Sequence, residues 1–232
     1  MASVERLLES TSISARDVES GQTLIEYAAR HSDLSLLKYC YRRGASLTAL
    51  TGSGDSVVNI AVAAKAYPLV EFLVLYGKAI NQGDGRGVTA LHTAVNINDV
   101  DGICRLVVWG ADVTVKVLAG QTPLMYAAIR GHAQVAELLL ELGANLNSLD
   151  LKDYTAVAHA EANDHFKLMD RLVLLGGRGH KMANNKIAAP LPRGGLSDAD
   201  EVTAKGVKLG KVSVNPLYLK KVAPIGRLNK FA

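Results

Sequence analysis

Histidine and cysteine are the residues of this chain best suited to metal binding or nucleophilic catalysis, because imidazole and thiolate groups serve in both. The 232 residues include six histidines and two cysteines. No two histidines have the spacing of a metal-binding pair, and neither Cys40 nor Cys104 has a histidine at a readable spacing. His31 and His159 stand alone, and the carboxylates are scattered. The sequence therefore predicts no catalytic residue, no metal site and no cofactor.

Two glycine-rich segments, Gly52–Gly54 and Gly83–Gly87, have a composition that could cradle phosphate. Neither follows a predicted strand, and neither is followed by Gly-Lys-Ser or Gly-Lys-Thr. We expect both to be turns between helical units.

Composition narrows the class of protein. Apolar residues make up 49% of the chain and charged residues 21%, which is typical of a globular protein. No run of eighteen apolar residues occurs, so no membrane span is expected. The first residues, MASVERLLES, lack the apolar core of a secretory signal. The sequence predicts a location in the cytoplasm, in a cytoplasmic assembly or in the nucleus.

Most of the chain follows a repeat of 33 residues. Glycines 21, 54, 87 and 120 are 33 residues apart, and Asp153 continues the series. Three further kinds of position recur with them: a hydroxyl two residues later, an alanine seven residues later and a glycine 23 residues later. Their members are Thr23, Ser56, Thr89, Thr122 and Thr155; Ala28, Ala61, Ala94, Ala127 and Ala160; Gly44, Gly77, Gly110, Gly143 and Gly176.

Each recurring position has a mechanical explanation. A Ser or Thr can cap a helix by accepting from its free N–H groups. Pro123 and Pro68 fall where helices should begin, at N1, where a missing N–H costs nothing. The alanine lets neighbouring helices approach, and apolar residues at i, i+3 and i+4 mark a second helix in each unit. A closing glycine at C′ can end that helix in a left-handed conformation.

These residues resemble the ankyrin repeat, and the resemblance is strongest in the fourth unit, which reads Gly120-Gln-Thr-Pro-Leu124 and ends Gly143-Ala-Asn145. It implies an all-α solenoid of stacked helix–turn–helix units with short hairpin connections. After Gly176 the period stops, and an extended C-terminal tail is expected. We expect a capping half-repeat in residues 1–19, five repeats in 20–177 and the tail in 178–232. Lys65 stands where the family usually has glycine, so we expect unit two to depart from ideal geometry.

The C-terminal tail differs in charge from the repeats. Residues 1–176 have a net charge of −4, whereas residues 177–232 hold 11 Lys and Arg against 3 Asp and Glu, a net charge of +8. The tail is either solvated or an arm that binds an acidic surface or nucleic acid. The candidate anchors are its cations, Lys205, Lys208, Lys211, Lys220, Lys221, Arg227 and Lys230.

The residue before each closing glycine is expected to point outward. Stacking would align Arg43, Tyr76, Trp109, Leu142 and Leu175 in a ridge that is mostly apolar, and exposed apolar patches often mark interfaces. The alternative is that the ridge is covered from within the chain. As an interface, the ridge predicts that Trp109→Ala weakens partner binding by about 2 kcal/mol or more.

A second outward series lies late in the first helix of each unit, where the implied ankyrin fold binds partners. Ile97, Ile129 and Arg130 belong to it, and Val88 and Tyr154 extend the same surface. The central units, three and four, are therefore expected to carry the main contact.

These features predict a non-catalytic interaction module, scaffold or adaptor that binds a protein partner through the repeat surface, with the tail as a second attachment. The alternative is a structural subunit of a ribonucleoprotein or cytoskeletal assembly, anchored by the tail to RNA or to an acidic protein surface. No small-molecule substrate and no membrane partner are expected.

Overall fold

A computed structural model describes residues 16–17 and 21–179. This part of the chain contains ten helices, arranged as five consecutive pairs. The first helices of the pairs are α2 (Leu24–Arg30), α4 (Val57–Ala63), α6 (Ala90–Asn96), α8 (Pro123–Arg130) and α10 (Ala156–Ala162). The second helices are α3 (Leu34–Arg42), α5 (Tyr67–Gly77), α7 (Val100–Val108), α9 (Ala133–Glu141) and α11 (Phe166–Leu174).

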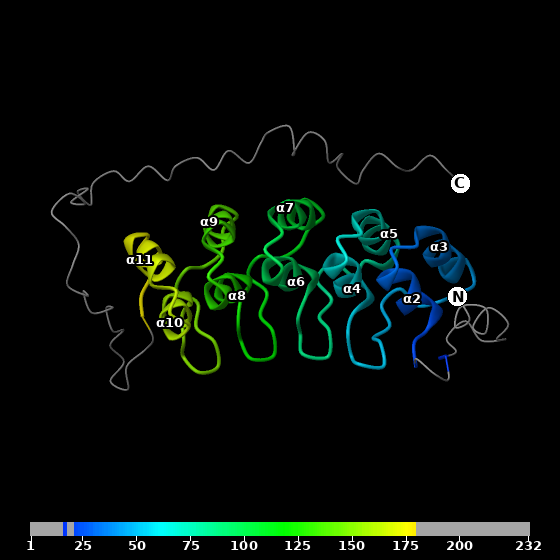
Figure 1. The fold of residues 1–232 in the computed structure, drawn as a ribbon, viewed down its shortest axis with the longest axis horizontal. Coiled ribbons are helices and arrows are strands. Elements are labelled where there is room, and N and C mark those ends of the chain that lie inside the picture. The colour runs from blue at the N-terminus through cyan, green and yellow to red at the C-terminus, as the bar shows by residue number, and fades with distance from the viewer. Residues whose placement is uncertain (1–15, 18–20, 180–232) are drawn as a thin grey trace.

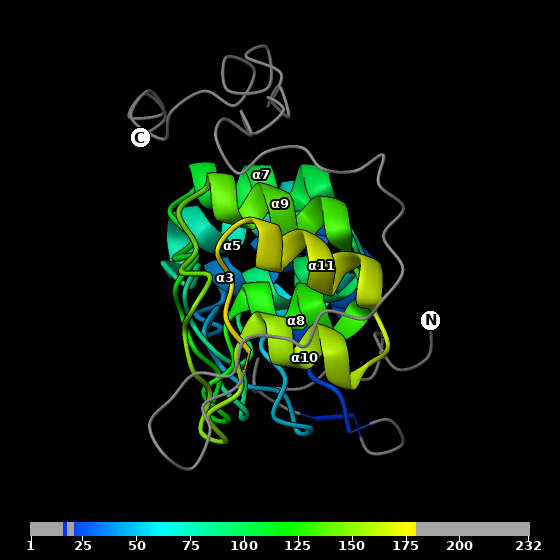
Figure 2. The same cartoon turned by 90° about the vertical axis from the view of Figure 1, so that its left-hand side faces the viewer.

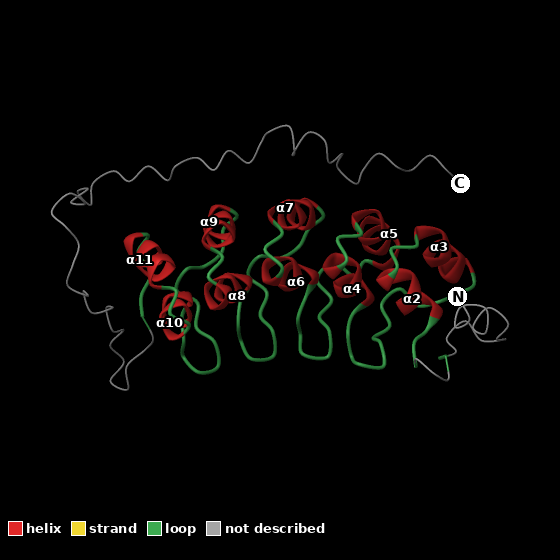
Figure 3. Ribbon diagram, viewed as in Figure 1, coloured by secondary structure: helices red, strands yellow, loops and turns green. Residues whose placement is uncertain are grey.

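The helices form two layers. Figure 1 shows the second helices side by side in one row and the first helices in a row beneath them, from which the hairpin connections project. The end view in Figure 2 shows the two rows stacked with the hairpins extending past the first helices. No strand forms in the described residues, as Figure 3 shows, and their one isolated β-bridge joins Leu50 and Ser56. The predicted all-α solenoid is confirmed.

The recurring hydroxyl residue is the N-cap of every first helix, as predicted. Thr122 accepts a hydrogen bond from the Met125 N–H at 3.3 Å, and Thr155 accepts from the Ala158 N–H at 3.2 Å. Ser56 makes no such bond. The caps fix where each first helix begins, and this sets the position of the groove-lining residues described below.

The recurring alanines occupy the interior of the array. All five are fully buried, and they belong to the hydrophobic core that runs through the units. A methyl group at this position allows the first helices of successive units to lie close together. Cys40 is also fully buried, and burial raises the pKa of its thiol to about 11. Cys104 is half-buried and packs against the core.

Unit two departs from the pattern, but not where the sequence suggested. Lys65 takes a left-handed conformation with φ of 54°, close to the values at Ser32, Asn98 and Asp164 in the same turn of other units. The inter-helix turn is therefore conserved in shape despite the lysine. Pro68 is the second residue of α5, not the first.

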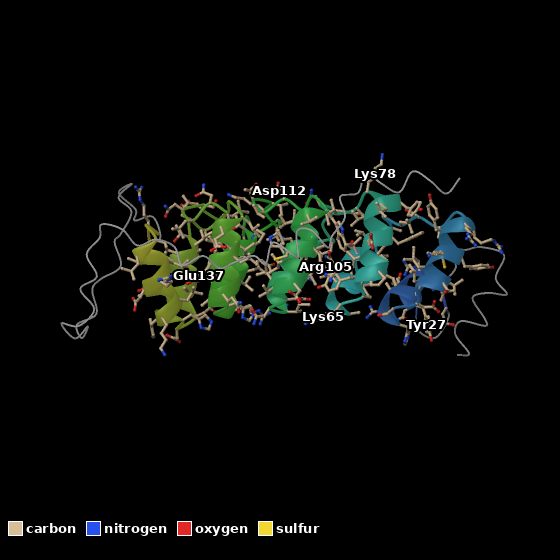
Figure 4. All side chains as sticks on the ribbon, turned by 90° about the horizontal axis from the view of Figure 1, so that it is seen from above. Tyr27, Lys65, Lys78, Arg105, Asp112 and Glu137 are labelled. Atoms are coloured by element: carbon tan, nitrogen blue, oxygen red, sulfur yellow. The ribbon has the colours of Figure 1, made fainter. Side chains whose placement is uncertain are left out.

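The departure lies at the end of α5. Gly77 is helical, and Lys78 takes the left-handed conformation that the closing glycine has in the other four units. In those units the next residue is Ala or Gly, and its N–H bonds five residues back, as from Ala111 to the Leu106 carbonyl at 2.9 Å. Lys78 stands at that position and is exposed, so α5 ends two residues later than the other second helices and Ala79 is buried instead. Figure 4 shows Lys65 and Lys78 at opposite edges of the layer.

Backbone hydrogen bonds join successive hairpins. The Gly85 N–H donates to the Gly54 carbonyl at 2.8 Å, and the Leu151 N–H donates to the Ala119 carbonyl at 3.1 Å. Glycine allows this approach: a Cβ at Gly120 would lie 2.8 Å from the Leu151 nitrogen. The segments Gly52–Gly54 and Gly83–Gly87 are turns of these hairpins, as predicted.

Two predicted segments cannot be compared with the structure. The capping half-repeat in residues 1–19 lies almost wholly outside the described residues, and so does nearly all of the tail in 178–232. Their boundaries stay predictions. None of the described helices is long and apolar enough to span a bilayer.

Candidate partner-binding groove

A groove of about 640 Å³ runs along the first helices and hairpins of units two to four. Figure 1 shows the elements that form most of it: α4, α6 and α8 with the hairpins that precede α4 and α6. α2 contributes one lining residue, Arg30. The other lining residues are Asp55, Asn59, Ile60, Ala63, Ala64, Asp84, Arg86, Val88, His92, Thr93, Asn96, Tyr126 and Arg130. Units two and three contribute most of the lining, and unit four contributes Tyr126 and Arg130.

Three exposed arginines line the groove. Arg30 ends α2, Arg86 lies in the hairpin before α6, and Arg130 ends α8. The Nε of Arg130 donates to the Asn96 Oδ1 at 2.7 Å, which fixes the direction of its guanidinium. Arg30 has no side-chain hydrogen bond or ion pair within residues 16–17 and 21–179. Its guanidinium can therefore bind a carboxylate in bidentate fashion, through two parallel N–H···O hydrogen bonds.

The two acidic residues of the groove are held by the hairpins. Asp84 is buried, and its Oδ1 accepts from the N–H groups of Arg86 at 2.8 Å and Val88 at 2.9 Å. Its Oδ2 pairs with Arg86 Nη2 at 3.2 Å. Asp55 accepts from the Ser53 hydroxyl at 2.7 Å. Three arginines and two aspartates leave the groove with a net charge of +1 on a repeat region whose sequence is net negative.

A neutral histidine forms part of the floor. His92 is fully buried, and burial lowers its pKa to about 4. The Nδ1 atom lies 3.4 Å from the Thr89 nitrogen and 3.0 Å from the Thr89 hydroxyl, and Nε2 lies 3.3 Å from the Gln121 carbonyl. These partners suit a ring that accepts at Nδ1 and donates at Nε2, which is the neutral form. The His92 ring meets the Tyr126 ring edge to face at 5.0 Å, so it supports the wall of the groove.

One buried polar atom of the groove has no partner. Asn59 is only 7% exposed, and its Nδ2 donates to the Val88 carbonyl at 2.7 Å. Its Oδ1 has no hydrogen-bond partner among the described residues. A buried acceptor without a donor costs free energy, which a bound partner could recover by supplying an N–H or O–H group.

The structure brings together some of the residues predicted for the partner surface. Val88 and Arg130 line the groove. Ile97 and Ile129 are half-buried at the ends of α6 and α8 and lie outside its lining. Tyr154 belongs to unit five, beyond the groove, where its ring lies 5.5 Å from the ring of His159.

The ring of His159 is not isolated, contrary to the sequence analysis. Its Nε2 lies 2.9 Å from the Asp150 Oδ2. Burial alone would raise the pKa of Asp150, but the N–H groups of Tyr154 and Lys152 and the bond to His159 outweigh burial and lower it. This pair supports the last hairpin, and the spacing of nine residues gave no signal for it.

The expectation of a continuous exposed ridge is wrong. Trp109 is only 7% exposed and belongs to the main hydrophobic core, whereas Tyr76 at the equivalent position is 56% exposed. Leu142 and Leu175 are half-buried. The indole is covered from within the chain, so Trp109 is not available as an anchor for a partner, and the ridge is interrupted at its centre.

Sequence reasoning missed most of the groove. Asp84 and Arg86 lie in a hairpin, where no periodic pattern says which side chains turn toward the helices. Asn59 and Tyr126 lie in the first turns of α4 and α8. A signal existed for one row: Ile60, Thr93 and Tyr126 are 33 residues apart and all line the groove. The predicted tail anchors, from Lys205 to Lys230, lie outside the described residues.

No group of three or more metal-binding side chains occurs in the part of the chain that the structure describes. The polar groups of the groove are three arginines, two aspartates held by the hairpins, amides and a neutral histidine, and the net charge of +1 suits recognition of a polar backbone with carboxylates.

Comparison with known proteins gives a consistent result. A profile of ankyrin repeats in three copies matches residues 91–183. A putative ankyrin repeat protein of Rickettsia bellii is 35% identical over 137 residues, which are 58% of this chain and 76% of that protein. Human ankyrin repeat domain-containing protein 63 is 33% identical over 134 residues, 56% of this chain and 33% of the relative.

Other relatives are much longer than the matched region. The glycerophosphocholine phosphodiesterase gde1 of Schizosaccharomyces pombe is 33% identical over 105 residues, which are 45% of this chain but 9% of that protein. A match over so small a share of an enzyme carries no activity to this chain.

Proposed function

Because this chain belongs to the ankyrin-repeat family, whose repeats are protein–protein interaction modules, we propose that it binds a protein partner through the groove of units two to four and performs no catalysis. The observation that carries this proposal is the set of three exposed arginines in one groove, one of which has no partner within the described residues. The partner is an extended segment or loop that carries carboxylates.

The geometry supports a segment of polypeptide as the occupant. The groove crosses three units, so an extended chain lying in it would meet the arginines in turn. Asn59 Oδ1 would receive a backbone N–H, and the Tyr126 ring would pack against an apolar side chain.

Reversing two charges of the groove tests the proposal. Arg30→Glu combined with Arg130→Glu is expected to weaken partner binding by at least about tenfold, because two attractive contacts become repulsive. The variant and the wild type are used side by side to capture partners from the native cell. The protein whose capture falls is then purified, and its Kd is measured by titration calorimetry.

Lys167→Glu is the matched control, since Lys167 is an exposed cation on α11, far from the groove. It should capture the same partner as the wild type. Equal capture by all three proteins, with the folded state verified by circular dichroism, would show that the groove is not the recognition surface.

The basic tail supports a second attachment. Its net charge of +8 is opposite in sign to the net charge of the repeats, so it would bind an acidic protein surface or RNA in a structural assembly. Deleting residues 180–232 is expected to reduce affinity and to make the remaining binding less sensitive to salt, as measured by titration at two ionic strengths. Complete loss of partner binding on deletion would instead favour the alternative function, in which the tail is the main anchor.

A further inference from the structure

A group of aromatic side chains lies on the second-helix layer of units one and two, away from the groove. Tyr39 and Tyr41 are on α3, and Phe72 and Tyr76 are on α5. The ring centroids of Tyr41 and Phe72 are 5.6 Å apart, those of Tyr41 and Tyr76 are 5.4 Å apart, and those of Phe72 and Tyr76 are 4.5 Å apart. These four residues are called the aromatic patch.

The aromatic patch is open to solvent. Tyr39 is 37% exposed, Tyr41 is 40% exposed and Tyr76 is 56% exposed. The other large apolar side chains exposed in the described residues are leucines, three in hairpins and Leu174 at the end of α11. The patch therefore differs from scattered surface leucines, because the rings of Tyr41, Phe72 and Tyr76 are contiguous and come from two adjacent helices.

Exposed cations follow the aromatic residues at the ends of the two helices. Arg42, Arg43 and Lys78 are exposed at the C-terminal ends of α3 and α5, and Figure 4 shows Lys78 projecting from the array at that edge. Arg43 lies over the Tyr39 ring, 5.7 Å from its centroid, and its Nη1 donates to the Tyr39 hydroxyl at 2.9 Å. α3 contains no acidic residue and α5 contains only Glu71.

The positive charge of Arg42, Arg43 and Lys78 helps to decide which of three ligands fits the patch: the basic tail of this chain, nucleic acid or an acidic protein segment. The tail of this chain is itself strongly basic, so it would be repelled. Nucleic acid is disfavoured because the rings of the patch pack against one another instead of standing apart as a platform for bases. A protein segment with carboxylates and apolar side chains matches both the cations and the rings.

We propose that the aromatic patch, with Arg42, Arg43 and Lys78, is a second docking surface that binds an acidic, apolar-containing segment of a partner protein. Tyrosine and arginine are the residue types most enriched in binding hot spots, and here they occur together on one exposed surface. The surface lies on different helices from the groove, so it does not rest on the function proposed for the groove.

A defined peptide tests this surface. The probe is a fluorescein-labelled peptide of about 14 residues that repeats Glu-Phe-Glu-Leu, titrated with the full chain by fluorescence anisotropy. Tyr76→Ser and Arg43→Glu are each expected to weaken its binding by at least about tenfold. The peptide with Lys in place of Glu is expected not to bind.

Matched controls separate the patch from general surface effects. Leu174→Ser removes an exposed apolar side chain from α11, and Lys167→Glu reverses an exposed charge on the same helix. Both are expected to bind the peptide within about twofold of the wild type. Tyr76→Phe should restore most of the affinity that Tyr76→Ser loses, which distinguishes a lost contact from a lost fold.

Four outcomes would overturn the proposal. They are no binding of the acidic peptide to the wild type, equal losses in the patch and control variants, and loss only in the Arg30→Glu, Arg130→Glu groove variant. The fourth is preferential binding of an oligouridylate RNA at the patch, which would assign the surface to nucleic acid.

Discussion

Replacing Gly120 with alanine is expected to lower the free energy of unfolding by at least about 3 kcal/mol. Two costs combine at this position. The backbone has φ of 78°, which penalises any L side chain, and the added Cβ would lie 2.8 Å from the Leu151 nitrogen and 3.2 Å from Asp150 Cα. Both contacts are with backbone, so relieving them would separate the hairpins and weaken the bond between Leu151 and Ala119. Urea denaturation followed by circular dichroism measures the loss.

Gly143→Ala is the matched control for Gly120→Ala. Gly143 has φ of 95°, but a Cβ there would meet nothing within 4 Å. Its cost is therefore the backbone penalty alone, about 1 to 2 kcal/mol. Equal losses for the two variants would show that the close approach of the hairpins contributes nothing to stability.

His92→Gln is expected to make the free energy of unfolding less sensitive to acid. Histidine in an unfolded chain has a pKa near about 6.5, whereas burial lowers the pKa of His92 to about 4. Between these values the unfolded state binds a proton that the native state does not, so stability falls as pH decreases through this range. The wild type should lose about 2 to 3 kcal/mol more than His92→Gln between about pH 7 and about pH 4.5, in urea titrations at each pH.

Glutamine suits this test because it has no titratable proton and can replace histidine in its contact with the Thr89 cap. His31→Gln serves as the control, since His31 is exposed. It should follow the wild type across the same range. A wild type and His92→Gln with parallel pH dependence would mean that His92 takes up its proton without cost, which is incompatible with the hydrogen bonds that its Nδ1 accepts.

The fold was predictable because its determinants repeat. A hydroxyl before each first helix, a buried alanine within it and a closing glycine recur five times, and local chemistry gives each one meaning. Unit two departs from the repeat, but the sequence pattern did not predict the position of that departure correctly. Lys65 accepts a left-handed conformation, while the change occurs at Lys78, because only the folded unit shows which neighbouring position is buried.

The groove was less predictable because it depends on how units face one another. Val88 and Arg130 were predicted from their outward positions, whereas Arg86 and Asn59 were not. Trp109 shows the limit most directly: its register matches that of exposed Tyr76, yet it is buried. Spacing alone says that two residues are equivalent, but neighbouring side chains decide whether each is covered.

The hairpin junctions have a mechanical consequence. The bond from Gly85 to Gly54 and the bond from Leu151 to Ala119 each connect a unit only to its immediate neighbour. Tension applied along the axis would be carried in series, from one unit to the next, by these bonds together with the packing between neighbouring helices. We therefore expect the array to extend elastically at low load and to lose the contacts between neighbouring units one interface at a time at high load.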